Sequence, residues 1–203
     1  MSHRNEALHN IAIVGVSASP SENSSTAKVL DNVLSRLASS GTAVKHIRLR
    51  DLSPSALVRG DAAESSVVEA LKSADAAAGI VFATPIYKAA YSGLLKLFLD
   101  LMPQFGLAGK TVLALGTGGS LAHALALDYG LRPVLQSMGA RHVIQSLLVP
   151  TGSIKIDDEN MIFDESIEVA LSEAVHHLQC SIVGDTGDRL LGHPRPVRTI
   201  PLA

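Results

Sequence analysis

Apolar residues along the chain form short runs that alternate with segments of helical spacing. Nearly continuous runs, typical of strands buried on both faces of a sheet, occur at Ile11–Ser17, Ala77–Ala83 and Lys110–Gly116. Val44–Leu49 alternates apolar with polar residues and predicts a less buried strand. With His142–Val149 as the last strand, the pattern predicts five strands in all.

Between these runs, apolar residues recur every three or four positions, which predicts amphipathic helices. The helices are expected at Ser24–Leu37, Glu64–Ser73, Tyr91–Met102, Ser120–Met138 and Glu165–Gln179. Asp51–Asp61 is expected to be a loop and Thr151–Asn160 a polar connection. Because strands and helices alternate with short connections, we expect an α/β fold with helices on both faces of a doubly wound parallel sheet.

Length and composition bound the size and partners of the protein. The 203 residues, 47% of them hydrophobic, suffice for one core and are too few for two ordinary domains. We expect one domain over residues 1–183 and a weakly structured tail over 184–203, where glycine and proline recur. The net charge of −2 gives no positive field for a nucleic acid.

Several other classes of protein and site are also disfavoured. The longest stretch without Asp, Glu, Lys or Arg, Thr111–Leu127, is shorter than the roughly 20 apolar residues of a membrane span. The polar N-terminus lacks a signal-peptide pattern, and a lone cysteine, Cys180, forms no intrachain disulfide, so we expect a cytoplasmic protein. The eight histidines include no His-x-x-x-His pair, so no metal site is expected. Gly116–Leu121 lacks the third glycine of a dinucleotide fingerprint.

Three loops follow buried strands and are the candidate site, because ligands of doubly wound sheets bind at the carboxyl ends of the strands. The first loop, Ser17–Thr26, ends at a predicted helix N-terminus, where free N–H groups and the helix dipole favour a phosphate. Its hydroxyl groups, which can complete the cradle, belong to Ser19, Ser24, Ser25 and Thr26. The alternative is that Ser24 or Ser25 only caps the helix.

The second loop, Thr84–Gly93, and the third loop, Thr117–Ser120 with His123 one turn later, combine glycines with a rigid proline. Glycine lets the backbone approach a flat ligand closely, and Pro85 stiffens the wall of such a slot. Simpler roles remain open for three residues here. Tyr87 can pack at a helix end, Lys88 can be a solvated surface charge, and His123 can be a core histidine.

The residues of these loops resemble a known family. The segments that carry the resemblance are Ala83-Thr-Pro-Ile-Tyr-Lys-Ala-Ala-Tyr-Ser-Gly-Leu-Leu-Lys96, Thr117-Gly-Gly-Ser-Leu-Ala-His123 and Asp128-Tyr-Gly-Leu-Arg-Pro-Val-Leu135. They are similar to the flavodoxin-like NAD(P)H-dependent FMN reductases, and more narrowly to the reductase component of two-component alkanesulfonate monooxygenases. The resemblance implies a five-stranded sheet of order 2-1-3-4-5.

The resemblance also implies a ligand and a reaction. NADPH or NADH would pass a hydride to N5 of FMN, and the reduced flavin would go to a sulfonate-type monooxygenase partner. The phosphate loop maps to Ser17–Thr26. The ring-contacting loops map to Thr84, Pro85, Ile86, Tyr87 and Lys88, and to Thr117, Gly118, Gly119 and Ser120. Tyr87, Lys88 and His123 are expected to bind or position the ligands, and no catalytic residue is expected.

The first loop departs from the family pattern. Many members carry an arginine after the Ser-Pro pair, whereas here Ser21 follows Pro20. Phosphate charge would then rest on the helix dipole and the hydroxyls, so FMN is expected to come and go as a substrate. Two alternatives stay open: a quinone or azo-dye reductase of the same fold that retains FMN, and a non-catalytic flavin electron carrier.

The predicted helix Ser120–Met138 contains two residues that disfavour a helix. Gly130 costs about 1 kcal/mol relative to Ala, and Pro133 removes the donor for the carbonyl of Tyr129. A break there predicts a π-bulge or a kink. In the family, this helix forms a tetramer interface in which an inserted aromatic produces a π-helix, so Tyr129 is expected at the interface of a homotetramer or dimer. The alternative is an ordinary proline kink.

Overall fold

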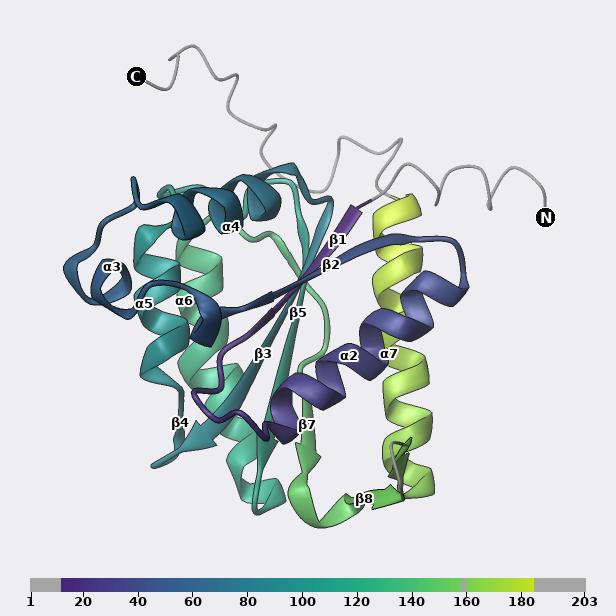
Figure 1. The fold of residues 1–203 in the computed structure, drawn as a ribbon. Helices are drawn as coiled ribbons and strands as arrows, with labels where there is room; N and C mark the ends of the chain where they lie inside the picture. The colour runs from purple at the N-terminus through teal and green to yellow at the C-terminus, as the bar shows by residue number, and fades with distance from the viewer. Residues whose placement is uncertain (1–11, 158–159, 185–203) are drawn as a thin grey trace.

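A mostly parallel sheet forms the centre of the protein (Figure 1). The computed structural model describes residues 12–157 and 160–184. The long parallel strands are β1 (Ala12–Ser17), β2 (Ala43–Arg48), β3 (Gly79–Tyr87) and β5 (Thr111–Gly118). They lie in the order β2-β1-β3-β5, and β6 (His142–Val143) and β7 (Leu147–Pro150) follow beside β5. This is the spatial order expected for the predicted strands.

The prediction of five strands was wrong, because the main sheet has seven. The short strand β4 (Ala90–Tyr91) turns back antiparallel on β3 and adds one. The predicted strand His142–Val149 divides into β6 and β7, which both pair with β5. Where β6 ends, the Arg132 guanidinium donates to the carbonyls of Val143 and Ile144 at 2.8 and 3.1 Å. These carbonyl oxygens would otherwise accept hydrogen bonds from a neighbouring strand.

Helices cover both faces of the sheet, as predicted. On one face lie α2 (Ser25–Ser39) and α7 (Glu165–Gly184), and on the other lie α3 (Pro54–Arg59), α4 (Ser65–Ala76), α5 (Gly93–Leu101) and α6 (Arg132–Ser137) (Figure 1). Each layer buries its own apolar cluster against the sheet. A Cβ at Gly15 would lie 2.8 Å from Leu34 Cδ1, so glycine lets α2 pack directly on β1.

Two segments expected to be irregular have regular structure. The loop predicted at Asp51–Asp61 contains the end of a 3-10 turn, η1 (Leu49–Asp51), and helix α3. Ser53 caps α3 by accepting from the N–H of Ala56, and Gly60 ends it with φ of 71°. The polar connection Thr151–Asn160 forms a 3-10 turn, η4 (Thr151–Ser153), and most of a hairpin of β8 (Ile154–Asp157) and β9 (Asn160–Phe163).

Some boundaries also differ from the predicted ones. The helix expected from Tyr91 starts at Gly93, because Tyr91 pairs with Ile86 in β4. The helix expected to end at Gln179 continues to Gly184. The predicted tail therefore lies outside the described residues apart from Gly184. In the described part of the chain, no helix is long and apolar enough to cross a membrane.

The helix predicted over Ser120–Met138 is not continuous. It consists of a 3-10 turn, η2 (Leu121–Ala124), a π-helix, η3 (Ala126–Leu131), and α6. The N–H of Arg132 donates to the carbonyl of Leu127, five residues earlier, and Pro133 lies in the first turn of α6. The prediction of one helix was wrong, whereas the predicted π-type break beside Tyr129 is confirmed.

Candidate functional site

The three predicted loops meet at the carboxyl edge of the sheet. Thr26, at the end of the first loop, and Thr117, in the third, have their hydroxyl oxygens 2.6 Å apart and are both buried. The second loop joins the first through Ser92, whose hydroxyl donates to the carbonyl of Ala18 at 2.7 Å. Side-chain hydrogen bonds therefore hold residues distant in sequence at one edge.

The first loop forms a turn that opens α2. Ser24 is the N-cap, and its hydroxyl accepts from the N–H of Ala27 at 3.0 Å, as the capping alternative proposed. The Ser19 hydroxyl accepts from the N–H of Ser21 at 3.3 Å, and Ser19 is buried. Ser25 is half-buried as the first residue of α2. The first N–H groups of a helix have no intrahelical acceptor, so this turn favours an anion.

Ser17 belongs to a hydrogen-bonded chain beneath the first loop. Its hydroxyl lies 2.8 Å from Nε2 of His46, and Nδ1 of the same ring lies 2.7 Å from Oδ1 of Asp31. Burial lowers the pKa of His46 from its ordinary 6.5, although hydrogen bonding to Asp31 works in the opposite direction. In its neutral form, His46 donates a hydrogen bond from Nδ1 to the Asp31 carboxylate and accepts one at Nε2 from the Ser17 hydroxyl. Sequence reasoning missed His46 and Asp31, which no motif marks.

The second loop is a tight hairpin with an unusual turn. Thr84, Pro85 and Ile86 are buried in β3, and Pro85 lies in register with Thr117 of the third loop. At the tip, Lys88 and Ala89 have φ of 50° and 61°, a left-handed conformation that costs energy in residues other than glycine.

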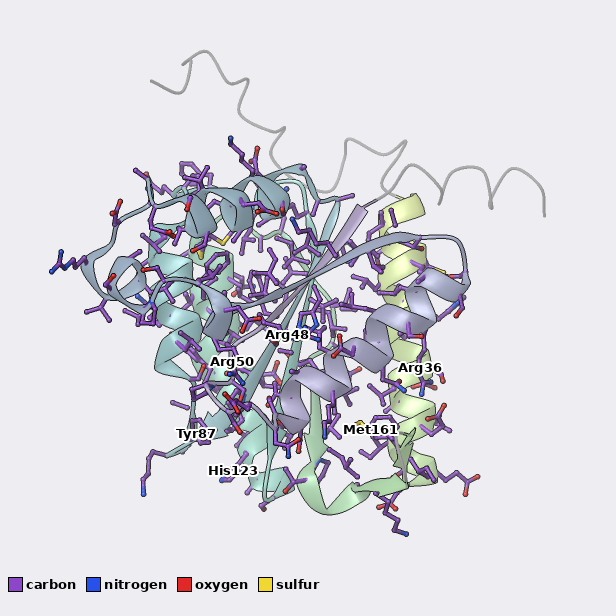
Figure 2. All side chains as sticks on the ribbon, in the orientation of Figure 1. Arg36, Arg48, Arg50, Tyr87, His123 and Met161 are labelled. Atoms are coloured by element: carbon purple, nitrogen blue, oxygen red, sulfur yellow. The ribbon has the colours of Figure 1, made fainter. Side chains whose placement is uncertain are left out.

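The second loop is exposed at its tip and hydrogen-bonded at its base. Tyr87 and Lys88 are exposed, and Tyr87 points toward the same end of the sheet as His123 (Figure 2). The Thr84 hydroxyl accepts from the N–H of Ser92 at 2.9 Å and donates to the carbonyl of Pro85 at 3.0 Å. Sequence reasoning missed Ser92, because the predicted helix began at Tyr91 and included it. A serine directly before an apolar helical run is nevertheless a typical N-cap, which is its position in the structure.

The third loop packs against His123. A Cβ at Gly118 would lie 2.9 Å from Nδ1 of His123, so only glycine fits there without a shift. This Nδ1 is buried and has no hydrogen-bond partner. No other buried side-chain nitrogen or oxygen of the described residues lacks one. Gly119 faces open space, and the Ser120 hydroxyl accepts from the N–H of Ala122.

A cavity of about 360 Å³ lies between the hairpin tip and the π-helix. Its lining includes Ala89 and Ala90 of the second loop, His123, and Tyr129 with Gly130 of the π-helix. Leu125 also lines it, and the exposed fractions of Leu125 and Tyr129 are 61% and 79%. The carboxyl edge therefore continues into an exposed apolar surface. No group of three or more potential metal ligands occurs in the described residues.

The fold is flavodoxin-like, and the three loops form a candidate ligand site at the carboxyl edge of its sheet. The sequence profile of the NADPH-dependent FMN reductases matches residues 11–153, and the chain belongs to that family. It is 34% identical over 166 residues to an FMN reductase (NADPH) of Escherichia coli K12, covering 80% of this chain and 85% of that protein. An FMN reductase (NADPH) of Pseudomonas putida KT2440 is 32% identical, with 91% of both chains covered.

Solved structures agree with this assignment. The apo crystal structure of an NADH:FMN oxidoreductase (EMOB) superposes with a TM-score of 0.81 at 48% identity, covering 92% of this chain and 97% of that one. A flavodoxin of Streptococcus pneumoniae TIGR4 shares the fold at 15% identity, with a TM-score of 0.56 and coverage of 84% and 99%.

The residues present fit FMN, the flavin named by the family. The helix N-terminus and hydroxyls of the first loop suit a phosphate. The glycines of the third loop suit a flat ring, since Gly119 faces open space. The unpartnered Nδ1 of His123 marks a polar atom at the same place. We find no donor set that suits a metal ion instead among the described residues.

Proposed function

We propose that this protein reduces FMN with NADPH or NADH. The observation that carries the proposal is that the family match spans all three loops, which buried hydrogen bonds join at one edge of the sheet. When bound, FMN would supply the hydride acceptor, N5, so that NAD(P)H is oxidised while the flavin, with a proton from solvent, is reduced.

The chain's own residues bind and orient the ligands. The first loop holds the phosphate at the start of α2 through Ser19, Ser24, Ser25 and Thr26, with Ser17 supporting the turn. The second loop, from Thr84 to Lys88, and the third, from Thr117 to Ser120 with His123, hold the ring. We assign no side chain to proton transfer, and the contribution that we propose for the protein is to hold the two rings in orientation.

The activity is tested by oxidation of NADPH and NADH with FMN, FAD and riboflavin as acceptors. We expect nicotinamide oxidation that depends on added flavin and is fastest with FMN. Absence of flavin-dependent oxidation with either nicotinamide would contradict the proposed reaction.

We also propose that FMN exchanges and that the reduced flavin leaves for a partner monooxygenase of the sulfonate type. Supporting this, the first loop contains no Lys or Arg between Ser17 and Thr26 that could hold the phosphate tightly. The proposal predicts a colourless purified protein whose rate saturates with added FMN. A yellow protein whose rate does not respond to FMN, and which reduces quinones or azo dyes, would favour the alternative reductase.

The π-helix supports a proposal about assembly. Tyr129 and Leu125 are exposed apolar side chains beside the candidate ring site. A second copy of the chain that covers them would bury this apolar surface and close the cavity. We therefore propose a homotetramer, or a dimer in exchange with one, that uses the surface around Tyr129.

A further inference from the structure

The candidate phosphate site contains no basic residue in its own loop. The single charged residue between Ser17 and Thr26 is an acid, Glu22, and its side chain is 89% exposed. A phosphate binds more tightly where charge-assisted hydrogen bonds are available than where hydroxyls alone donate. A cation that serves this site must therefore come from another segment of the chain.

Arg50 reaches the first loop from the connection after β2. Its Nη2 lies 3.1 Å from Oε1 of Glu22, and its Nε lies 3.5 Å from Oδ1 of Asp51. Arg50 and Pro20 also line the same cavity of about 300 Å³. In Figure 2, Arg50 lies above Tyr87 and His123, on the same side of the view. The ion pair thus holds a guanidinium against the loop that would receive the phosphate.

Arg48 and Lys28 also lie near the first loop. Arg48 donates to Oδ2 of Asp31 at 3.0 Å, and this carboxylate also bonds His46, so Arg48 is engaged at the middle of α2. Lys28 donates to Oδ1 of Asn23 at 3.1 Å and is exposed. The Arg50 side chain is only 28% exposed, and its planar guanidinium suits bidentate contact with a phosphate. Lys28 is the rival that a test must separate from it.

We propose that Arg50 is the phosphate-binding cation of this site, and that Glu22 competes with the FMN phosphate for its guanidinium. The inference rests on the proposed function, in which FMN is the ligand. The Arg50 guanidinium gives the site a preference for FMN over riboflavin, which lacks the phosphate. The competing carboxylate of Glu22 weakens that preference and favours exchange of FMN.

The test measures dissociation constants of FMN and riboflavin by quenching of flavin fluorescence. Arg50→Gln is expected to weaken FMN binding about 10- to 100-fold, because it removes charge-assisted hydrogen bonds. Riboflavin binding should change by less than about two-fold, as for a surface substitution. Glu22→Gln is expected to tighten FMN binding about 10-fold, because it removes the competitor and a repulsive charge, without affecting riboflavin.

Arg59→Gln is the matched control. Arg59 is exposed at the end of α3, and like Arg50 it lies in the connection between β2 and α4. Arg59→Gln changes the net charge by the same amount as Arg50→Gln. We expect its FMN affinity to stay within about two-fold of the parent protein. A loss equal to that of Arg50→Gln would show an effect of net charge alone and would overturn the inference.

Three further outcomes would overturn it. Arg50→Gln could leave FMN affinity unchanged, or weaken FMN and riboflavin equally, which would indicate a structural role. Lys28→Gln could weaken FMN binding more than Arg50→Gln, which would assign the phosphate to Lys28. In each case the parent protein still reduces FMN, so the proposed function stands. A parent protein that neither binds nor reduces FMN would instead contradict the proposed function, and the inference with it.

Discussion

Buried hydroxyl groups fix the loops of the candidate site relative to one another. Ser92 donates to the carbonyl of Ala18 and caps α5, while Thr84 accepts from the N–H of Ser92. Thr26 and Thr117 form a similar contact between the first and third loops. These contacts orient the loops before any ligand binds, which reduces the entropy that binding must overcome.

Replacing Ser92 with alanine tests this role. Ser92→Ala should lower the free energy of unfolding by about 2 kcal/mol, because it removes a helix cap and leaves the Ala18 carbonyl without its donor. It should also weaken FMN binding. Urea denaturation measures the first effect and a flavin titration the second.

Ser39→Ala is the control, since the exposed Ser39 hydroxyl bonds only one turn back, to the carbonyl of Ser35. It should change stability by less than about 0.5 kcal/mol. Equal effects of the two substitutions would contradict the role assigned to Ser92.

Ala89 allows a test of the strained hairpin tip. Its φ of 61° is unfavourable for alanine and free for glycine. Ala89→Gly should therefore raise the free energy of unfolding by about 0.5 kcal/mol, after the entropy cost of glycine is subtracted. Ala90→Gly, at the adjacent position of ordinary φ, should lower it by a similar amount. Destabilisation by both substitutions, measured by urea denaturation, would count against strain at the tip.

At the scale of elements, His46 links three parts of the fold, since it lies on β2 and bonds Ser17 of β1 and Asp31 of α2. Burial lowers the pKa of His46 in the folded protein below its ordinary 6.5. The unfolded chain therefore takes up a proton at this residue before the folded protein does. Stability from neutral His46 is present above pH 6.5 and is lost as the pH falls toward the lowered folded value.

The prediction is measured by urea denaturation at about pH 7.5 and about pH 5.5. The parent protein should lose more stability between these values than His46→Gln, which lacks the titrating group. An identical pH dependence for the two proteins would refute this assignment.

The elements that were predicted correctly have strong local signals. The continuous apolar runs of β1, β3 and β5 indicate burial on both faces, and Gly130 with Pro133 locates the π-helix. The β3–β4 hairpin has no such signal, because Lys88 and Ala89 occupy a turn that normally takes asparagine or glycine. Helix α3 has a cap and a terminal glycine, but its six residues show no clear helical period.

The fold of the whole molecule determines which polar residues come together at the candidate site. Strand order alone brings the three loops to one edge, so the sequence locates the loops. Their internal partners depend on contacts across long separations, such as the 74 positions between Ala18 and Ser92 and the 28 between Glu22 and Arg50. No local pattern encodes such pairs. For this reason the long-range partners of Ser92, His46 and Arg50 are seen only in the folded structure.

Assembly into an oligomer is a property of the whole molecule. Light scattering after size exclusion should give a tetramer or dimer for the parent protein. Tyr129→Ala should favour smaller species and change the rate of flavin release, with little loss of stability, because Tyr129 is 79% exposed in a single chain. Parent protein that is monomeric at every concentration, with and without FMN, would refute the assembly. An unchanged flavin exchange rate in Tyr129→Ala would refute its link to release.

In the proposed complex, the three loops bind FMN with its phosphate at the start of α2. A crystal structure of the protein soaked with FMN measures this directly. We predict the phosphate within hydrogen-bonding distance of the first turn of α2, and the flavin ring between the second and third loops. Density for FMN elsewhere, or a phosphate that no group of the first loop contacts, would contradict the account.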